Sequence, residues 1–504
     1  MPQVGKKERN NKKSAIIFLK RYWSIILLVF LLIGIVYLPK LINYNYSIDT
    51  ERMIRFPDYT LNWWLRLGRY GLVALTKLPI FGGGTNINYI NFLTYVLLFF
   101  SAVILMYIFD KEADHTKIEQ FLAVGLYVTT PIILEQTNFV LQSAPVVFAS
   151  ITMLIGYGLL RRYLETKQIR YLVLGVALET FSFSVYVSLI IGFIGLAIVE
   201  LCYSSKKNLW SFKKYFSTAS YMAVISVISY GLYLLGNKLS FRIFSLKKTD
   251  YLAESRLWGN IPNDQVLATI KNSIQHNFNF ESPFVMWGFI LLLLLFVITS
   301  ILNKDNLAIT LITVISLLIV GTYTVPLFGY LGTLRSYFPV YPIIMYGLAL
   351  NSFEVKKYKI FEFIICLLIF LIVGIQSYNT FQLGENEAHI YDQEIELVND
   401  IQKDLTKNNV TDYKKYKLVL IGGRTFDEIT HGDMLGNSVF NWDLSSNVGV
   451  SYRAGDFMYN HGLKFKRPTP EEFSKSFSIA QKMRTYPQEG GIKVVNDLVI
   501  IRLS

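Results

Sequence analysis

Residues 23–41 read WSIILLVFLLIGIVYLPKL, and this first apolar run sets the class of fold. A helix needs about 20 predominantly apolar residues to cross a bilayer, so the run is long enough to span one. A basic segment precedes it, as in a secretory signal peptide, but no small-residue cleavage site follows it. We therefore predict a retained first membrane helix.

Apolar runs of the same kind recur along the chain. Of the 504 residues, 52% are hydrophobic and only 17% are charged, which exceeds the apolar content of ordinary soluble domains. Length and apolarity together predict about eleven spans. We therefore predict a mainly α, polytopic transmembrane bundle, with spans centred near residues 32, 98, 129, 151, 177, 194, 226, 292, 317, 342 and 368.

The net charge of +13 comes largely from short connections between the predicted spans. Cytoplasmic loops are enriched in Lys and Arg, so the pattern indicates topology and argues against nucleic-acid binding. With a cytoplasmic N-terminus and an odd number of spans, every basic cluster faces the cytoplasm and the C-terminus lies outside. The prediction is a multi-pass protein of the cell membrane. The basic clusters fall at residues 6–13, 161–162, 206–214 and 356–359.

Three segments are predicted to lie outside. The first external loop, residues 42–86, combines apolar residues at helical spacing with many cations, so we expect interfacial helices there. The second, residues 239–282, is partly helical by the same criterion. Residues 381–504 are polar and are predicted to form a small extracellular α/β domain after a transmembrane domain of residues 1–380. Its expected elements are a helix at 387–407, a strand at 417–421, a helix at 470–483 begun at Thr469 and a hairpin at 492–503 that turns at Asn496-Asp497.

The first external loop opens with two carboxylates, Asp49 and Glu51, in the stretch SIDTER at residues 47–52. Residues two apart in an extended stretch point to the same side. A carboxylate at a membrane surface can act as a general base on an acceptor hydroxyl. The alternative is that both carboxylates pair with Arg52 and Arg55 and only anchor the loop, and the residues alone leave these two interpretations open.

Arginine is the side chain best shaped to hold a lipid phosphate, because its planar fork can donate two hydrogen bonds. Arg69 and Arg335 are the best placed candidates, and Arg52 and Arg66 are further candidate substrate contacts; the alternative for all is ordinary contact with lipid headgroups. Glu179 lies within a predicted span and could line a polar cavity or only hydrogen-bond locally.

The sequence indicates no cofactor. Its two cysteines lie in apolar runs, and its five histidines show no ligand spacing, so no disulfide or metal site is predicted. A divalent metal is compatible with the sequence but is not indicated by it.

Several short motifs, taken in their order, resemble the GtrII-like polytopic glucosyltransferases of the wider GT-C class. No single motif is specific, but together they cover most of the chain. They are IDTE at residues 48–51, GRYG at 68–71, RSY at 335–337, FNWD at 440–443 and YPQEGGI at 486–492.

The resemblance implies an inverting transferase that moves one sugar, typically glucose, from a polyprenyl-phosphate carrier to a cell-surface glycan on the outer face. It implies that Asp49 is the catalytic carboxylate with Glu51 as its neighbour, and that Arg69 and Arg335 contact the donor phosphate. The chain has Asp-Thr-Glu where the class commonly has an uninterrupted acidic pair, so the choice between the two carboxylates stays open.

Two other functions fit the same pattern. A flippase or transporter of lipid-linked oligosaccharide would show ionisable groups near the middle of the membrane, and these are few here. A polymerase or ligase of surface polysaccharide would use the same carrier lipid, and the sequence separates it poorly from a transferase.

Overall fold

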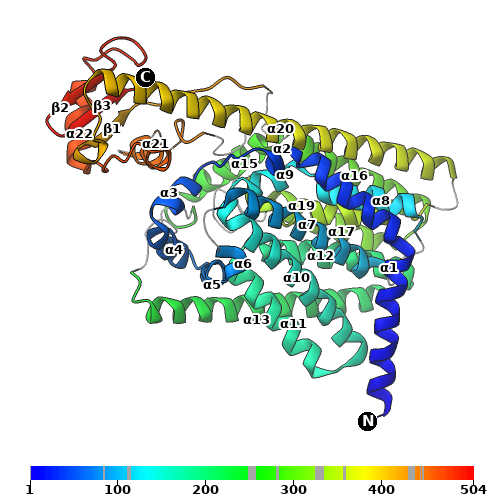
Figure 1. Ribbon diagram of the computed structural model, residues 1–504. Helices are drawn as coiled ribbons and strands as arrows, with labels where there is room; N and C mark the ends of the chain where they lie inside the picture. The colour runs from blue at the N-terminus through cyan, green and yellow to red at the C-terminus, as the bar shows by residue number, and fades with distance from the viewer. Residues whose placement is uncertain are drawn as a thin grey trace.

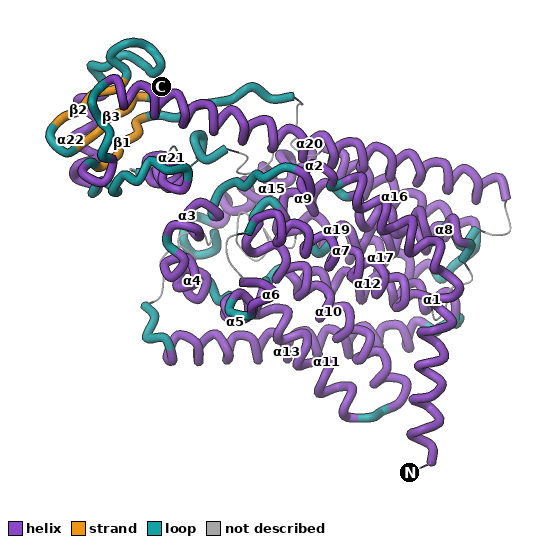
Figure 2. Tube along the Cα trace, viewed as in Figure 1, coloured by secondary structure: helices purple, strands orange, loops and turns teal. Residues whose placement is uncertain are grey.

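The protein is a helical bundle with a small mixed domain at one end (Figures 1 and 2). A computed structural model describes residues 2–82, 86–110, 115–247, 257–279, 283–323, 334–355, 359–429, 438–442, 444 and 448–504. The prediction of a mainly helical chain is confirmed.

The bundle is built from apolar helices whose residues are extensively buried where they meet. Its long members are α1 (Pro2–Val36), α7 (Ile87–Asp110), α10 (Val140–Thr166), α11 (Ile169–Val185), α12 (Leu189–Lys207), α13 (Phe212–Ile243), α16 (Pro283–Leu302) and α20 (Lys359–Lys407). Shorter members are α2 (Leu38–Ile42), α8 (Lys117–Thr129), α9 (Pro131–Thr137), α15 (Asn263–Asn279), α17 (Leu307–Leu318), η1 (Ile319–Tyr323), η2 (Leu334–Tyr337) and α19 (Tyr341–Ser352).

Eight helical segments in the described part of the chain are long and apolar enough to cross a membrane. They coincide with eight of the predicted spans, including one in which α8 and α9 together form Lys117–Thr137. The other three predicted spans, near residues 177, 317 and 342, coincide with the shorter helices α11, α17 and α19, of 17, 12 and 12 residues. The number of eleven stays a prediction.

Helix α19 lies at the centre of the bundle, and all twelve of its residues are buried. Its approach to α12 depends on Gly347, because a Cβ there would lie 2.4 Å from Cγ2 of Val199. The small residue therefore lets two helix backbones come close, as is common between membrane helices.

The described residues 43–82 of the loop that is predicted to be external form four short helices: α3 (Thr50–Arg55), α4 (Pro57–Arg66), α5 (Tyr70–Thr76) and α6 (Pro79–Gly82). Proline suits the first turn of a helix, so Pro57 and Pro79 start α4 and α6. Gly68, with φ +78°, makes the turn between α4 and α5, which a residue with a Cβ rarely adopts. In Figure 1 these helices lie at the end of the bundle that carries the C-terminal domain.

The C-terminal domain contains a three-stranded sheet in the order β1-β3-β2. Strand β1 (Lys417–Ile421) pairs in parallel with β3 (Leu498–Arg502), and β2 (Ile492–Val495) pairs antiparallel with β3. Helices α21 (Gly449–Asn460) and α22 (Pro470–Ala480) and the short η3 (Tyr413–Lys415) complete the domain. The predicted strand, the hairpin and the helix begun at Thr469 are confirmed; that helix ends at Ala480 rather than Met483.

Helix α20 joins the bundle to this domain without interruption. It runs for 49 residues from Lys359 to Lys407 and so includes both the last predicted span and the predicted helix 387–407. Its Glu387 carboxylate contacts the Lys40 ammonium at 2.8 and 2.9 Å, and both side chains are almost fully buried. This ion pair ties α20 to α2, and the domain boundary near residue 380 stays a prediction.

Candidate active site

The two loop carboxylates meet one arginine of the C-terminal domain. Nη1 of Arg453 donates to Oδ1 of Asp49 at 2.7 Å and to Oε1 of Glu51 at 2.8 Å. Asp49 has a left-handed backbone (φ 69°) immediately before α3, and Glu51 lies in the first turn of that helix. Arg453 lies on α21, so the pair is held between the loop that follows α2 and the C-terminal domain.

Asp49 and Glu51 differ in exposure and therefore in pKa. Burial favours the neutral acid in both, but for Asp49 the Arg453 guanidinium, helped by Arg335 and Arg52, outweighs this and lowers the pKa. The Asp49 side chain remains 40% exposed, whereas Glu51 is fully buried. Burial, with a smaller contribution from the neighbouring Asp49 charge, raises the pKa of Glu51 to about 7 despite Arg453. One carboxylate is thus kept ionised and accessible, and the other is enclosed.

Two arginines that the sequence singled out lie beside this pair. Arg335 and Arg69 each interact electrostatically with Asp49 and with one another. The Arg335 guanidinium stacks on the Phe139 ring, 3.8 Å from its centre. Nη1 of Arg69 donates to Oε1 of Gln142 at 3.0 Å. Two cations held near one another and near a carboxylate can bind an anionic group with both charges.

Helix α5 places Arg69 by a close contact with the end of α11. Arg69 directly precedes α5, and Gly71 in its first turn lies against the α11 backbone at Ser184. A Cβ on Gly71 would lie 2.1 Å from Oγ and 3.0 Å from the backbone carbon of Ser184. Just beyond α11, the Tyr186 ring lies below the Arg69 guanidinium, at 5.4 Å from its centre. The motif Gly68-Arg69-Tyr70-Gly71 thus supplies a turn, a cation and a close helix contact.

The remaining predicted site residues lie at or beyond the edge of this group. Nε of Arg52 is 3.8 Å from Oδ2 of Asp456, although its charge also lowers the pKa of Asp49. Arg66 ends α4, and its buried Nε has no hydrogen-bond partner among the described residues. Glu179 is fully buried in α11, and within the part of the chain that the structure describes neither of its carboxylate oxygens has a hydrogen-bond partner. It lies seven residues before Tyr186, about 10 Å along a helix, and its role stays a prediction.

A second cluster docks the C-terminal domain onto α3. The buried Asp456 carboxylate accepts hydrogen bonds from Arg55, at 2.9 Å, and from Nε of Arg467, at 3.0 Å. Arg55 also donates to the carbonyl of Phe465 at 2.7 Å. The Asn460 amide donates to the Glu51 carbonyl at 2.9 Å. These contacts hold α21 against the loop independently of Arg453.

A histidine and two tyrosines close the same interface. The His461 ring, just after α21, lies 3.2 Å from the Tyr46 hydroxyl and 3.3 Å from the Tyr391 hydroxyl of α20. His461 therefore joins the loop, α20 and α21, and burial lowers its pKa, which favours the neutral ring. No group of three or more metal-ligating side chains occurs among the residues that the structure describes. His276 and His431, which the sequence also placed outside, have side chains outside the described part.

Sequence reasoning missed Arg453 and Asp456. Both belong to α21, where Arg453, Asp456 and Asn460 follow the spacing i, i+3 and i+7 that places side chains on one helical face. That pattern could have predicted a polar face on an amphipathic helix. It could not have indicated that the face contacts the loop some 400 residues earlier in the chain.

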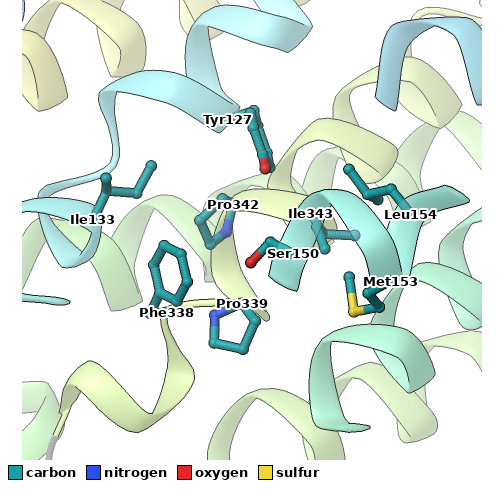
Figure 3. A pocket seen from close by; sticks show the side chains of 9 residues that line it. All are labelled: Tyr127, Ile133, Ser150, Met153, Leu154, Phe338, Pro339, Pro342 and Ile343. Atoms are coloured by element: carbon teal, nitrogen blue, oxygen red, sulfur yellow. The ribbon is translucent and has the colours of Figure 1, made fainter. Parts of the chain in front are cut away.

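A small pocket lies in the bundle close to Arg335 in the chain, since the Phe338 N–H on its lining donates to the Arg335 carbonyl at 3.0 Å. Figure 3 shows its lining residues, which come from α8, α9, α10 and α19 and the segment before α19. Phe338, Pro339 and Pro342 form one side, and the polar groups are the hydroxyls of Ser150 and Tyr127. Because none of its lining residues is charged, this pocket offers no cationic partner for a phosphate.

Comparison with known proteins identifies a family. The family model described as Glucosyl transferase GtrII matches residues 38–351, more than half of the chain. The matched region contains Asp49, Glu51, Arg69 and Arg335, and it ends before α20 and the C-terminal domain. No curated protein and no solved structure matches the chain.

Proposed function

Since the chain belongs to the GtrII family of glucosyltransferases, we propose that it transfers a single glucosyl residue from a polyprenyl-phosphate donor to a cell-surface glycan. The observation that carries this proposal is the grouping of an ionised Asp49 with Arg69 and Arg335 at one end of an apolar bundle. A donor with a lipid tail can stay in the bilayer while its phosphate reaches these cations. The site then needs no nucleotide.

Asp49 is the general base in this proposal. Its lowered pKa keeps it ionised, and its side chain is accessible, whereas Glu51 is enclosed and shares the Arg453 guanidinium. The acceptor hydroxyl oxygen attacks the anomeric carbon and gives its proton to Asp49. The bond from that carbon to the phosphate oxygen breaks, and the oxygen keeps the electron pair. Attack opposite the leaving group inverts the anomeric centre.

Arg69 and Arg335 stabilise the charge that develops on the leaving phosphate. Cations placed where charge develops contribute more in a site sheltered from water than in solution. The stacking of Arg335 on Phe139 and the hydrogen bond from Arg69 to Gln142 hold both guanidinium groups in place before substrate arrives. Arg52 and Arg66 would extend this positive surface, and Glu179 would contact the sugar only if a path opened from the site into the bundle.

The proposed orientation places α3 to α6 and the C-terminal domain outside the cell and the N-terminus in the cytoplasm. Two observations support it. The loop helices and the C-terminal domain lie at the same end of the bundle in Figure 1, and basic residues cluster in the short connections. Cytoplasmic loops of membrane proteins are enriched in Lys and Arg.

The test uses membranes from cells that produce the protein, with a short-chain polyprenyl phosphate carrying radiolabelled glucose as the probe. We expect label to pass into the lipid-free glycan, and the intact surface glycan of producing cells to gain the mass of one hexose. Asp49→Asn should lower the rate of transfer about 10²- to 10⁴-fold, the usual range for a lost general base. Asp58→Asn, an exposed aspartate on α4, is the matched control and should transfer normally.

Three outcomes contradict the proposal. Movement of the probe across the membrane without bond formation would identify a transporter, and addition of whole repeat units would identify a polymerase or ligase. Full activity of Asp49→Asn would show that Asp49 is not the general base.

A further inference from the structure

We infer that the C-terminal domain is part of the active site, because its Arg453 is a positioning residue that holds Asp49 and Glu51 in their reactive arrangement. This inference rests on the proposed function of Asp49 as the base. It assigns a catalytic contribution to a segment that lies beyond the region matched by the family model, residues 38–351.

The geometry shows why the carboxylates need this cation. One nitrogen contacts an oxygen of each at 2.7 and 2.8 Å, so these two oxygens lie within about 5.5 Å of each other, where like charges in a sheltered site repel strongly. The Arg453 side chain is only 9% exposed and Glu51 is fully buried, so water cannot take over the role of Arg453 at Glu51. Arg453 therefore fixes the distance and direction of Asp49 relative to Glu51.

Docking of the domain does not account for Arg453. Asp456, one turn further along α21, already binds Arg55 of α3 and Arg467. Asn460, two turns along, binds the Glu51 backbone. With these contacts in place, α21 stays against α3 when Arg453 is replaced, so a positioning role and a docking role can be measured separately.

The acidic limb of the pH profile reports this role. Asp49 faces Arg453 from α21, Arg335 from η2, Arg69 from just before α5 and Arg52 from α3. Glu51 faces the same Arg453 and Arg52, together with Asp49, Tyr46 and Glu394 of α20. Loss of Arg453 removes the strongest of the cations that favour ionised Asp49, so its pKa rises and activity fails at higher pH than in the parent protein.

The experiment measures probe transfer against pH in permeabilised membranes for the parent protein, Arg453→Ala, Arg453→Lys and Arg467→Ala. We expect Arg453→Ala to lower transfer and to move the acidic limb upward by about one pH unit or more, the usual effect of losing an adjacent opposite charge. Added guanidinium should restore part of the rate. Arg453→Lys keeps the charge and should show a smaller shift. Arg467→Ala also removes an arginine, but from the cluster around Asp456 that docks the domain, so the acidic limb of its pH profile should stay in place.

A second measurement does not depend on transfer. In purified protein, we expect Arg453→Ala to lower the melting temperature in the parent background and much less in an Asp49→Asn/Glu51→Gln background. Additive effects would show that Arg453 does not act on the carboxylates. An unshifted acidic limb in an active Arg453→Ala protein would overturn the positioning role while leaving the proposed function intact. If the parent protein did not transfer the probe, but Arg453→Ala lowered the melting temperature only when both carboxylates were present, the proposed function would be overturned instead.

Discussion

Replacing Glu51 with glutamine should stabilise the protein more at high pH than at low pH. The Glu51 carboxylate is fully buried between α3 and α21, and burial raises its pKa to about 7. Glutamine has nearly the shape of the protonated acid and carries no charge at any pH. The substitution therefore removes a titration while keeping most of the packing.

The size of the effect follows from the pKa of Glu51 in the two states. In the unfolded chain the group has its ordinary value of 4.5, so the folded protein binds this proton more tightly than the unfolded chain does. The stability that Glu51 contributes is complete below about pH 4.5 and is lost as the pH rises through about 7. One pKa unit corresponds to 1.36 kcal/mol, so the loss over this window is about 3 kcal/mol. The glutamine variant does not undergo this loss.

Melting temperatures of the detergent-purified protein at about pH 5 and about pH 8 measure the difference. We expect the melting temperature of Glu51→Gln relative to the parent protein to rise by a few degrees between the two pH values. Glu489→Gln, at an exposed glutamate of the C-terminal domain, is the control. Its melting temperature should differ from that of the parent protein by the same amount at both pH values. If Glu51→Gln also showed equal differences, burial would not control the protonation of Glu51, and our distinction between the two carboxylates would be wrong.

Two further predictions concern the ion pairs that hold the domain and the bundle together. Asp456→Asn should weaken docking of α21 onto α3 by about 3 kcal/mol of free energy, which should speed hydrogen exchange of the α21 amides about a hundredfold. The control is Asp412→Asn, at a half-exposed aspartate, which should leave exchange unchanged. A similar exchange rate in both variants would contradict the docking role. Lys40→Ala removes the ammonium that both Glu387 oxygens contact and should lower the free energy of unfolding by about 3–5 kcal/mol. The double variant Lys40→Met/Glu387→Leu leaves no unpaired charge and should recover most of this stability. Equal melting temperatures for the single and double variants would refute this.

The elements that the sequence predicted best are those specified by local chemistry. Strand β1 follows from an apolar run closed by glycines, and the final hairpin turns at Asn496-Asp497 as expected. Thr469 caps α22 through its hydroxyl, with Glu472 reaching back in the reciprocal pattern. Each signal lies within a few residues of the structure that it determines.

Features that depend on distant contacts were harder to predict. Apolarity alone does not show where a helix ends, so α20 passes through the predicted domain boundary, and α11, α17 and α19 are shorter than ordinary spans. The sequence singled out Asp49, Arg69 and Arg335 as candidates by their chemistry, and the structure brings these three together. The sequence could not identify Gln142 or Arg453, because an amide in a helix and an arginine on a polar face become informative only when the fold gives them partners.

Charge balance at the site explains why a cation from the C-terminal domain is useful to the proposed reaction. A donor phosphate bound by Arg69 and Arg335 would bring its negative charge close to Asp49, and that charge would partly cancel the cations that keep Asp49 ionised. Arg453 on α21 already donates to both carboxylates, so it is a third cation beside Asp49 that the phosphate does not need. Asp49 can then remain a base while the donor is bound, which is the moment at which the acceptor proton must leave.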